Sequence, residues 1–417
     1  MNYQIRDPAL APSGLQKIQW VDSYMPVLRA LEQELMPSQP FRGMRISLSI
    51  HLEAKTARLV LALKRLGADV QASGCNPLST QNDVAAALVS QGIPVFAWHG
   101  ATEEEYTSHL IKTLAHNPHV VMDDGADLAF LLHTTLKERA GSILGGTEET
   151  TTGVQRLRSL QADGLLQYPV IAVNDANCKY LFDNRYGTGQ SAWDGINRTT
   201  NLIVAGKTVV VAGYGWVGRG IAMRALGQGA KVIVTEIDPV KAMEAVMDGY
   251  QVMTMDAAAA LGDIFVTCTG CKDIIVGRHF EAMKGDVILC NAGHFDVEVN
   301  KNDLLAMADE HQERRQNIMG YRMPDGRWIN LIAEGRLVNL ASGDGHPAEI
   351  MDLSFALQLL SAVHVVSDHA SLAARVYVVP EAIDARVAAV KLQSWGLEID
   401  HLTPEQESYI KGWDVHS

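Results

Sequence analysis

The chain of 417 residues is 47% hydrophobic and 20% charged, and its net charge at neutral pH is −13. This length predicts two or three domains, and the negative charge argues against nucleic acid or an anionic membrane as a partner. The five cysteines are scattered, which is typical of a reducing cytoplasm. The sequence starts without a charged-then-apolar leader, and polar residues interrupt its longest apolar stretch, 355–366. We therefore expect neither a signal peptide nor a membrane span.

Short β-rich runs alternate with amphipathic stretches through the first part of the chain. Two of the predicted helices lie at residues 54–66 and 81–89. Strands are predicted at residues 44–50, 68–72, 94–97, 119–122, 142–144 and 169–173. This alternation predicts a doubly wound α/β domain with a parallel sheet.

A second alternating region follows a glycine-containing boundary near residues 184–189. Its strands are predicted at residues 208–212, 231–235, 250–253, 263–268, 286–290 and 337–340. The glycine-rich residues 342–345 predict a return crossing, and the helical segment 346–372 is expected to pack on the first domain. The tail from residue 382 is predicted to be helical and to carry a capped pattern at Thr403.

A cofactor fingerprint lies in mid-chain. Gly213, Gly215 and Gly218 form G-x-G-x-x-G between an apolar run and a helix predicted at 217–226. These glycines permit a tight turn, close approach of a pyrophosphate and close packing of the helix on the strand. Glu236 ends the next strand, where its carboxylate would accept from ribose hydroxyls and repel a 2′-phosphate. The fingerprint therefore predicts NAD rather than NADP, although Lys241 could reach the same ribose edge.

Polar clusters follow several predicted strands at their carboxyl ends, which is where parallel sheets bind ligands. These clusters span residues 51–56, 123–125, 145–153, 174–184 and 291–294. Lys179 and Asp183 are four residues apart, which places them on one face of a helix. Each cluster by itself could be structural, since Asp and Asn also cap helices. Their shared position beside a cofactor domain favours a catalytic site. Cys268 and Cys271 could form a redox pair or simply line a turn.

These residues resemble the S-adenosyl-L-homocysteine hydrolase family along almost the whole chain. The motifs that carry the resemblance are Cys75-Asn-Pro-Leu-Ser-Thr-Gln81, Asp123-Asp124-Gly125, Glu148-Glu149-Thr-Thr-Thr-Gly153, Lys179 with Phe182-Asp183-Asn184, Gly213-Tyr-Gly-Trp-Val-Gly218, Cys290-Asn-Ala-Gly-His294-Phe-Asp296, Glu334-Gly-Arg-Leu-Val-Asn339-Leu and Gly345-His346-Pro347. Glu53 and Lys55 resemble the pattern of archaeal and thermophilic-type members, some of which act on S-inosyl-L-homocysteine.

The resemblance implies an architecture and an assembly. Residues 1–184, completed by 346–380, would form a substrate-binding domain, 185–345 a Rossmann NAD-binding domain, and 381–417 a C-terminal dimerisation tail. The protein would be a cytoplasmic homotetramer of the methyl cycle that acts on a small nucleoside thioether. The chain ends without the Lys…Tyr extension of eukaryotic-type members, so the role of its shorter tail stays open.

The resemblance also implies a reversible hydrolysis to adenosine and L-homocysteine with catalytic NAD. The 3′-hydroxyl is oxidised, the thiol is eliminated, water adds, and the ketone is reduced again. Matching catalytic positions are His51, Asp124, Glu149, Lys179, Asp183 and His294. Lys179 and Asp183 would act at the 3′-hydroxyl, Glu149 would hold the ribose hydroxyls, and the histidines would move protons beside Asp124. A lysine base there needs a lowered pKa, through burial or nearby positive charge.

Other positions match binding roles in the family. The substrate-binding positions are Glu53, Lys55, Thr56, Gln81 and His346. The cofactor-binding positions are Thr150, Thr151, Thr152, Asn184, Gly213, Gly215, Val217, Gly218, Glu236, Thr269 and Asn339. No metal is expected.

The purine preference stays open at this stage. Many members carry Thr, then Gln or Glu, where Glu53 and Lys55 stand. Hypoxanthine offers a donor at N1 and an acceptor at O6, which match a carboxylate and an ammonium. Adenine offers the two in swapped order, and the same pair could meet it. Hydrolysis of S-inosyl-L-homocysteine to inosine is therefore the alternative function. A plain dehydrogenase would release NADH, and a non-catalytic member would lack an acid–base residue, whereas here none is missing.

Overall fold

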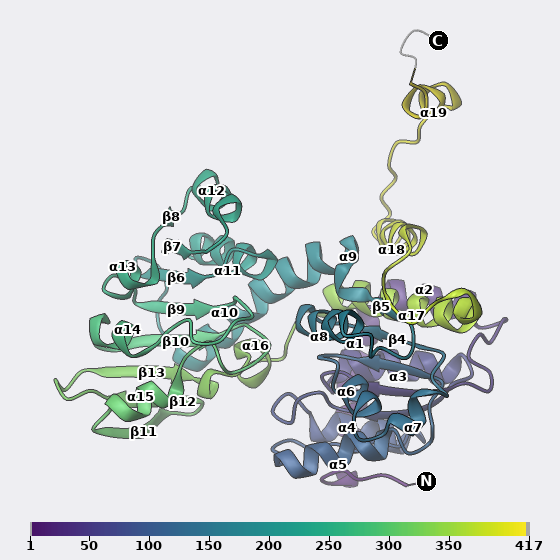
Figure 1. Cartoon of the computed structure of the whole chain (residues 1–417), viewed down its shortest axis with the longest axis horizontal. Helices are drawn as coiled ribbons and strands as arrows, with labels where there is room; N and C mark the ends of the chain where they lie inside the picture. Colours follow the sequence, from purple (N-terminus) through teal and green to yellow (C-terminus); the bar gives the residue numbers. More distant parts are fainter. Residues whose placement is uncertain (1, 414–417) are drawn as a thin grey trace.

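The computed structural model of the chain describes residues 2–413, which form two sheets with helices on their faces (Figure 1). The first sheet is parallel, with strand order β14-β5-β4-β3-β1-β2. Its strands are β1 (Arg45–Ser49), β2 (Asp69–Ser73), β3 (Val120–Asp123), β4 (Gly145–Glu148), β5 (Val170–Ala172) and β14 (Val376–Val378). The late strand β14 joins the edge of the sheet beside β5, so the end of the chain returns to its first half.

The second sheet has the order β11-β12-β13-β10-β9-β6-β7-β8. Its strands are β6 (Thr208–Ala212), β7 (Lys231–Thr235), β8 (Gln251–Val252), β9 (Ile264–Thr267), β10 (Val287–Asn291), β11 (Glu310–Arg315), β12 (Ile318–Arg322) and β13 (Trp328–Ile332). Pairing is parallel from β13 to β8, and β11, β12 and β13 pair antiparallel. Both sheets are thus Rossmann-like, as predicted.

Helices cover both faces of each sheet. Those before the second sheet are α1 (Ala11–Ser23), α2 (Pro26–Leu35), α3 (Ala54–Arg65), α4 (Asn82–Ser90), α5 (Glu103–Thr113), α6 (Asp127–His133), α7 (Lys137–Ala140), α8 (Thr151–Ala162), α9 (Asn177–Lys179) and α10 (Thr188–Thr200). Those after it begins are α11 (Trp216–Gly227), α12 (Pro239–Met247), α13 (Met255–Ala259), α14 (Gly277–Ala282), α15 (Lys301–Met307), α16 (Val338–Ala341), α17 (Ala348–Asp368), α18 (Glu381–Ser394) and α19 (Pro404–Lys411). Short 3₁₀ turns are η1 (Pro8–Leu10), η2 (Val173–Asp175), η4 (Ala333–Gly335) and η5 (His369–Ser371), and η3 (Tyr180–Gly187) is a π-helical stretch.

Strand alternation divides the apolar side chains between the two faces of each sheet. Val120 and Met122 of β3 belong to one core with α2, α3, α4 and α17, whereas Val121 packs with residues of α5, α6 and α8. In β6, Val209 and Val211 face α10 and α11, and Val210 faces the opposite core. Strands buried on both faces read as continuous apolar runs, which explains why β6 and β7 were recognisable in the sequence.

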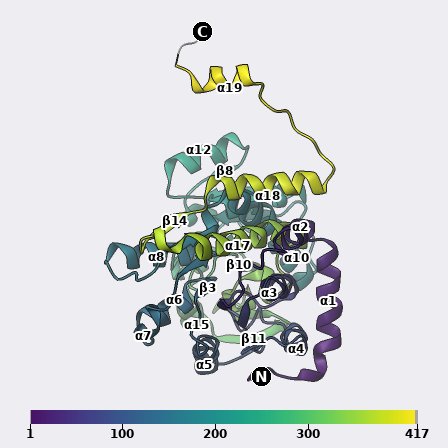
Figure 2. The ribbon, with the colours of Figure 1, turned by 90° about the vertical axis from the view of Figure 1, so that its right-hand side faces the viewer.

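Helix α17 is the central helix of the first core. By length and composition, Ala348–Ser371 could cross a membrane, and it is longer than the apolar stretch seen in the sequence. However, 72% of its most apolar window is buried inside the protein, as in the core helix of a globular domain. Figure 2 shows α18 lying beside α17, while α19 stands away from the body of the molecule.

Some sequence predictions of secondary structure were wrong. Residues 94–97 form only isolated bridges, from Val95 to Ala72 and from Phe96 to Gln4, and the strand predicted at 142–144 begins later, as β4. Residues 337–340 lie largely in helix α16 rather than a strand. The antiparallel strands β11, β12 and β13 and the edge strand β14 were not predicted. Between the sheets, η3 continues directly into α10 without a loop.

Candidate active site

Lys179 is held among buried acidic and amide groups at the end of the first sheet. It ends α9, just after β5, and the following π-helical turn brings Asp183 and Asn184 back toward it. Lys179 Nζ donates to Asp183 Oδ1 (3.0 Å) and Asn184 Oδ1 (2.9 Å), and Glu149 Oε1 lies 3.6 Å away. Single π-helical turns occur frequently at functional sites.

The charges around Lys179 decide its protonation in the chain alone. Burial by itself lowers the pKa of Lys179, but the carboxylates of Asp183 and Glu149 outweigh burial and raise this pKa. Lys179 and His346 in turn hold the pKa of Asp183 below its usual range against the opposing effect of burial. The lowered lysine pKa that a base requires is therefore not a property of the chain by itself. If Lys179 is the base, as the sequence predicts, its lowered pKa would come from a nearby positive charge.

Glu149 follows β4 and is fully enclosed. Burial raises the pKa of Glu149 to about 8, although Lys179 lowers it. Its Oε2 accepts a 2.6 Å hydrogen bond from Gln358 Nε2 of α17. Its Oε1 is buried and has no hydrogen-bond partner among residues 2–413. A buried oxygen of this kind is costly unless a ligand completes it, so Glu149 fits a ribose hydroxyl donor.

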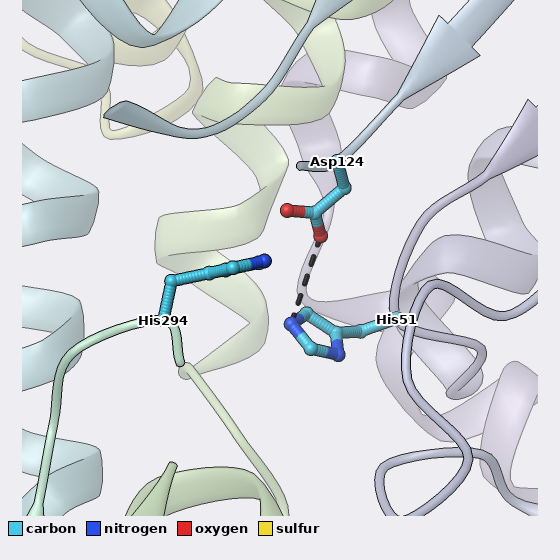
Figure 3. A group of neighbouring side chains, drawn as sticks. All are labelled: His51, Asp124 and His294. Carbon is cyan, nitrogen blue, oxygen red and sulfur yellow. Dashed lines mark ion pairs between the residues drawn. The ribbon is translucent and has the colours of Figure 1, made fainter. Parts of the chain in front are cut away.

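Two histidines and a carboxylate converge in a second group, as Figure 3 shows. His51 follows β1, Asp124 follows β3, and His294 follows β10 of the second sheet. Their ligand-type atoms lie within 4.8 Å of one another, and His51 Nε2 is 3.7 Å from Asp124 Oδ2. Burial lowers the pKa of His51, which favours the neutral imidazole that can accept a proton. These donor types would also suit a divalent metal ion, and the expectation of no metal stays a prediction.

Residues from the second half of the chain close the site. His346 Nε2 lies 3.2 Å from Asp183 Oδ1, and its Nδ1 is 3.2 Å from both Ser191 Oγ and Asn339 Nδ2. Asn339 Oδ1 is buried and unpartnered within the described part of the chain. His346 therefore connects the Lys179 group to the α10–α16 region and lies on the return crossing predicted from the sequence.

The nucleotide loop has the form that its glycines predict. Gly213 has φ +98°, a conformation that favours glycine, and a Cβ on Gly218 would lie 2.0 Å from the Gly213 carbonyl oxygen. A Cβ on Gly215 would meet nothing within 4 Å among the described residues, so its backbone is open to a pyrophosphate. Glu236 accepts from the amides of Tyr214, Ile237 and Asp238. The loop and its acidic residue fit a dinucleotide at the amino end of α11.

Comparisons with known proteins agree with this geometry. A family model described as S-adenosyl-L-homocysteine hydrolase matches residues 2–144, and the NAD binding domain model of the same family matches residues 184–345. The S-inosyl-L-homocysteine hydrolase of Methanopyrus kandleri is 55% identical over 99% of this chain and 97% of its own. The adenosylhomocysteinase of Pyrococcus abyssi is also 55% identical, over 99% and 98%. The S-inosyl-L-homocysteine hydrolase of Methanocaldococcus jannaschii is 53% identical over 99% of both chains.

The chain belongs to the S-adenosyl-L-homocysteine hydrolase family. This confirms the resemblance seen in the sequence, and with it an NAD-dependent hydrolase and NAD as its cofactor. The roles of individual residues remain predictions, which the geometry can only support.

Several residues predicted to bind ligands in this hydrolase already serve the fold. Thr56 Oγ1 donates to the His51 carbonyl oxygen, Thr150 caps α8, and Thr269 Oγ1 donates to Glu298. Gln81 Oε1 accepts from Lys17, near the surface. Thr151 donates to Asn174 Oδ1, which also accepts from Asn184. Thr152 and Val217 are half-buried near the amino ends of α8 and α11. These contacts tie the site to the helix termini around it.

Several side chains that touch the site were not predicted from the sequence. Ser79 Oγ lies 2.6 Å from His51 Nδ1, and Cys75 Sγ donates to Asp124 Oδ2 at 3.4 Å. Ser354 and Gln358 of α17 donate to Asp183 and Glu149. Cys75 and Ser79 lie within a quoted motif, and the polar pair in an apolar helix was a visible signal. Nothing in the sequence alone showed which face of α17 they occupy.

Proposed function

We propose that this hydrolase cleaves the thioether of S-adenosyl-L-homocysteine, reversibly giving adenosine and L-homocysteine. The observation that carries the proposal is the placement of Lys179 between Asp183 and Glu149, in the same site as the group of His51, Asp124 and His294. Asp124 is close enough to raise the pKa of both Lys179 and Glu149. An oxidation centre and an elimination centre would thus lie close together, as a nucleoside whose 3′ and 5′ positions both react requires.

Lys179, Glu149 and Asp183 form the oxidation centre, which would act on the 3′-hydroxyl. When bound, NAD+ accepts a hydride from the ribose carbon, returns it later, and places positive charge near the site. Lys179 takes the hydroxyl proton, and the free oxygen of Glu149 orients the ribose through a hydrogen bond. Asp183 holds the Lys179 ammonium in place through a 3.0 Å contact, so the amine stays aimed at one atom through the cycle.

Asp124, His51 and His294 form the elimination centre, which would act at C4′ and C5′. Oxidation at C3′ makes the C4′ proton acidic, and its removal breaks the bond from C5′ to sulfur. Asp124 would act near these carbons, and His51 and His294 would give the leaving thiolate a proton. In the second half, the same groups take a proton from the water that adds at C5′. A lowered pKa of His51 through burial suits an imidazole that alternates between the two states.

The purine would lie against Glu53 and Lys55 at the start of α3. Both side chains are buried, and Lys55 Nζ lies 2.7 Å from Glu53 Oε2 and donates to the Asp344 carbonyl oxygen at 3.0 Å. Glu53 also accepts from the amides of Lys55 and Thr56. This pair offers an acceptor and a donor side by side, which would match the N1 and O6 edge of hypoxanthine and, in swapped order, the edge of adenine. Hydrolysis of S-inosyl-L-homocysteine is therefore the second candidate function.

We further infer that the protein is a cytoplasmic homotetramer of the methyl cycle, with residues 381–417 as its dimerisation tail. The isolated chain exposes apolar side chains along this tail, including Leu397, Ile399, Tyr409 and Ile410. A second copy of the chain is the natural partner for such a surface in a family of this architecture.

The deciding experiment incubates the purified protein, loaded with NAD+, with each thioether and follows the release of free thiol. We expect release from the adenosyl thioether, and faster release from the inosyl thioether if the Glu53–Lys55 pair is selective. Lys179→Ala should still bind NAD+ but form no NADH on addition of adenosine or inosine. Wild-type protein that releases thiol from neither compound, or undiminished NADH in Lys179→Ala, would refute the proposal.

A further inference from the structure

Helix α17 carries a buried polar row in an otherwise apolar sequence. Ser354, Gln358 and Ser361 are each fully buried, and their spacing of four and three residues places them on one face of the helix. Burying hydroxyl and amide groups in a core is unfavourable unless they form hydrogen bonds. Two of these three side chains have such partners, and both partners are carboxylates of the site described above.

Gln358 links Glu149 to the neighbouring strand. Its Oε1 accepts from Thr147 Oγ1 of β4 (2.5 Å), and its Nε2 donates to Glu149 Oε2 (2.6 Å). An ionised carboxylate can only accept, whereas the Thr147 hydroxyl can donate, so the amide has one consistent orientation while Glu149 is charged. The contact occupies the outer oxygen of Glu149 and leaves the inner one, Oε1, facing Lys179 at 3.6 Å.

Ser354 lies one turn earlier on the helix and forms the corresponding hydrogen bond with one oxygen of Asp183. Ser354 Oγ donates to Asp183 Oδ2 at 2.8 Å. The other oxygen, Oδ1, is then free for Lys179 Nζ and His346 Nε2, at 3.0 and 3.2 Å. Each carboxylate beside Lys179 therefore has one oxygen held by α17 and one turned into the site.

We propose that Gln358 and Ser354 are positioning residues, which hold the outer oxygens of Glu149 and Asp183 and thereby present the inner oxygens to Lys179 and the ribose. This inference deepens the proposed hydrolase function and rests on it. A hydrogen bond donated to a carboxylate stabilises its charged form. Loss of the Gln358 amide should thus raise the pKa of Glu149 further above the value of about 8 that burial gives it.

The test follows single-turnover NADH formation when NAD+-loaded protein is mixed with adenosine or inosine over a range of pH. In Gln358→Leu we expect about tenfold slower formation near neutral pH, with the acid limb of the profile displaced upward by about one pH unit. In Ser354→Ala we expect a smaller loss, of roughly two- to fivefold. The affinity for NAD+ should not change in either variant, because neither side chain touches the nucleotide loop.

Ser361→Ala is the matched control. This side chain is on the same buried row, and its Oγ has no hydrogen-bond partner within residues 2–413, so rate and profile should match the wild type. Unchanged rates in both test variants would overturn the proposal, and so would slower turnover of Gln358→Leu with an unshifted profile, since that marks a packing role only. If Gln358→Leu does not fold, Ser354→Ala decides alone. Wild-type protein that forms no NADH would instead count against the hydrolase function itself.

Discussion

At the scale of single residues, the site contains several carboxyl groups whose pKa is raised by burial. Asp123, Glu148 and Glu149 meet at the ends of β3 and β4, and burial is the first cause of the raised pKa of each. The pKa of Asp123 is raised to about 7, that of Glu149 to about 8, and that of Glu148 well above its usual value. Hydrogen bonds from backbone amides partly offset this effect of burial, since Glu148 accepts from the amides of Gly125 and Ala126. The loop that carries Asp124 is thus held by carboxyl groups whose ionised form is destabilised by burial.

Glu149→Gln should make the ligand-free protein more stable at high pH. A carboxyl whose pKa is raised by folding stabilises the fold below its unfolded pKa, and this stability is lost as pH rises through its folded pKa, here about 8. The variant cannot ionise, so its advantage in stability over the wild type should grow by roughly 1–3 kcal/mol between about pH 6 and about pH 9. Thermal midpoints at the two pH values measure this as a difference of several degrees.

The control for this prediction is Glu104→Gln, at a surface glutamate on α5. Its carboxyl is exposed, so the substitution should leave the pH dependence of the midpoint as it is in the wild type. Equal slopes for the wild type and Glu149→Gln would mean that Glu149 is not the group whose ionisation weakens the fold.

At the scale of elements, the approach of α11 to β6 decides cofactor binding. Gly218→Ala should abolish it, because the new methyl group would meet the Gly213 carbonyl oxygen at 2.0 Å and Cys268 Sγ at 3.3 Å. The helix would have to move away from the strand, and its amino end would no longer meet the pyrophosphate. We expect at least a hundredfold weaker NAD+ binding, or about 3 kcal/mol, measured by titration calorimetry.

Gly227→Ala is the matched comparison on the same helix. Nothing among the described residues lies within 4 Å of the added methyl group there, and alanine favours a helix by about 1 kcal/mol over glycine. This variant should bind NAD+ normally and be as stable as the wild type or more so. Similar losses in both variants would indicate a general weakening of α11 rather than a steric block at the loop.

Elements that carry a local signal were predictable from the sequence. The valine-rich runs of β6 and β7 were predicted with the bounds they have, because strands buried on both faces read as unbroken apolar segments. β11 was missed because its residues, Glu-His-Gln-Glu-Arg-Arg, are all exposed and show no alternation. Residues 337–340 were predicted as a strand from Leu337, Val338 and Leu340, but such a short run of apolar residues does not distinguish a short helix from a strand. The face of α17 that meets Glu149 depends on packing across the whole domain.

At the scale of the whole molecule, α18 and α19 differ in how they join the body. Asp384 of α18 accepts from the amides of Asn177 and Cys178, just before Lys179, and Lys391 contacts the buried carboxylate of Asp352. The end of the chain thus supports the turn that carries Lys179. Beyond α18 the described residues are exposed, and α19 lies clear of both sheets in Figures 1 and 2.

Removing the chain from residue 397 onward should break the proposed homotetramer while leaving each chain folded. The exposed apolar side chains Leu397, Ile399, Leu402, Tyr409 and Trp413 gain nothing by facing water in the isolated chain, and their burial between copies would favour association. We expect light scattering after size-exclusion chromatography to give a smaller mass for the truncated protein than for the full chain. The paired substitution of the exposed Glu405 and Glu407 by glutamine changes the same helix without removing apolar surface, so its mass should match the full chain. An unchanged number of copies after truncation would show that the tail has no role in assembly.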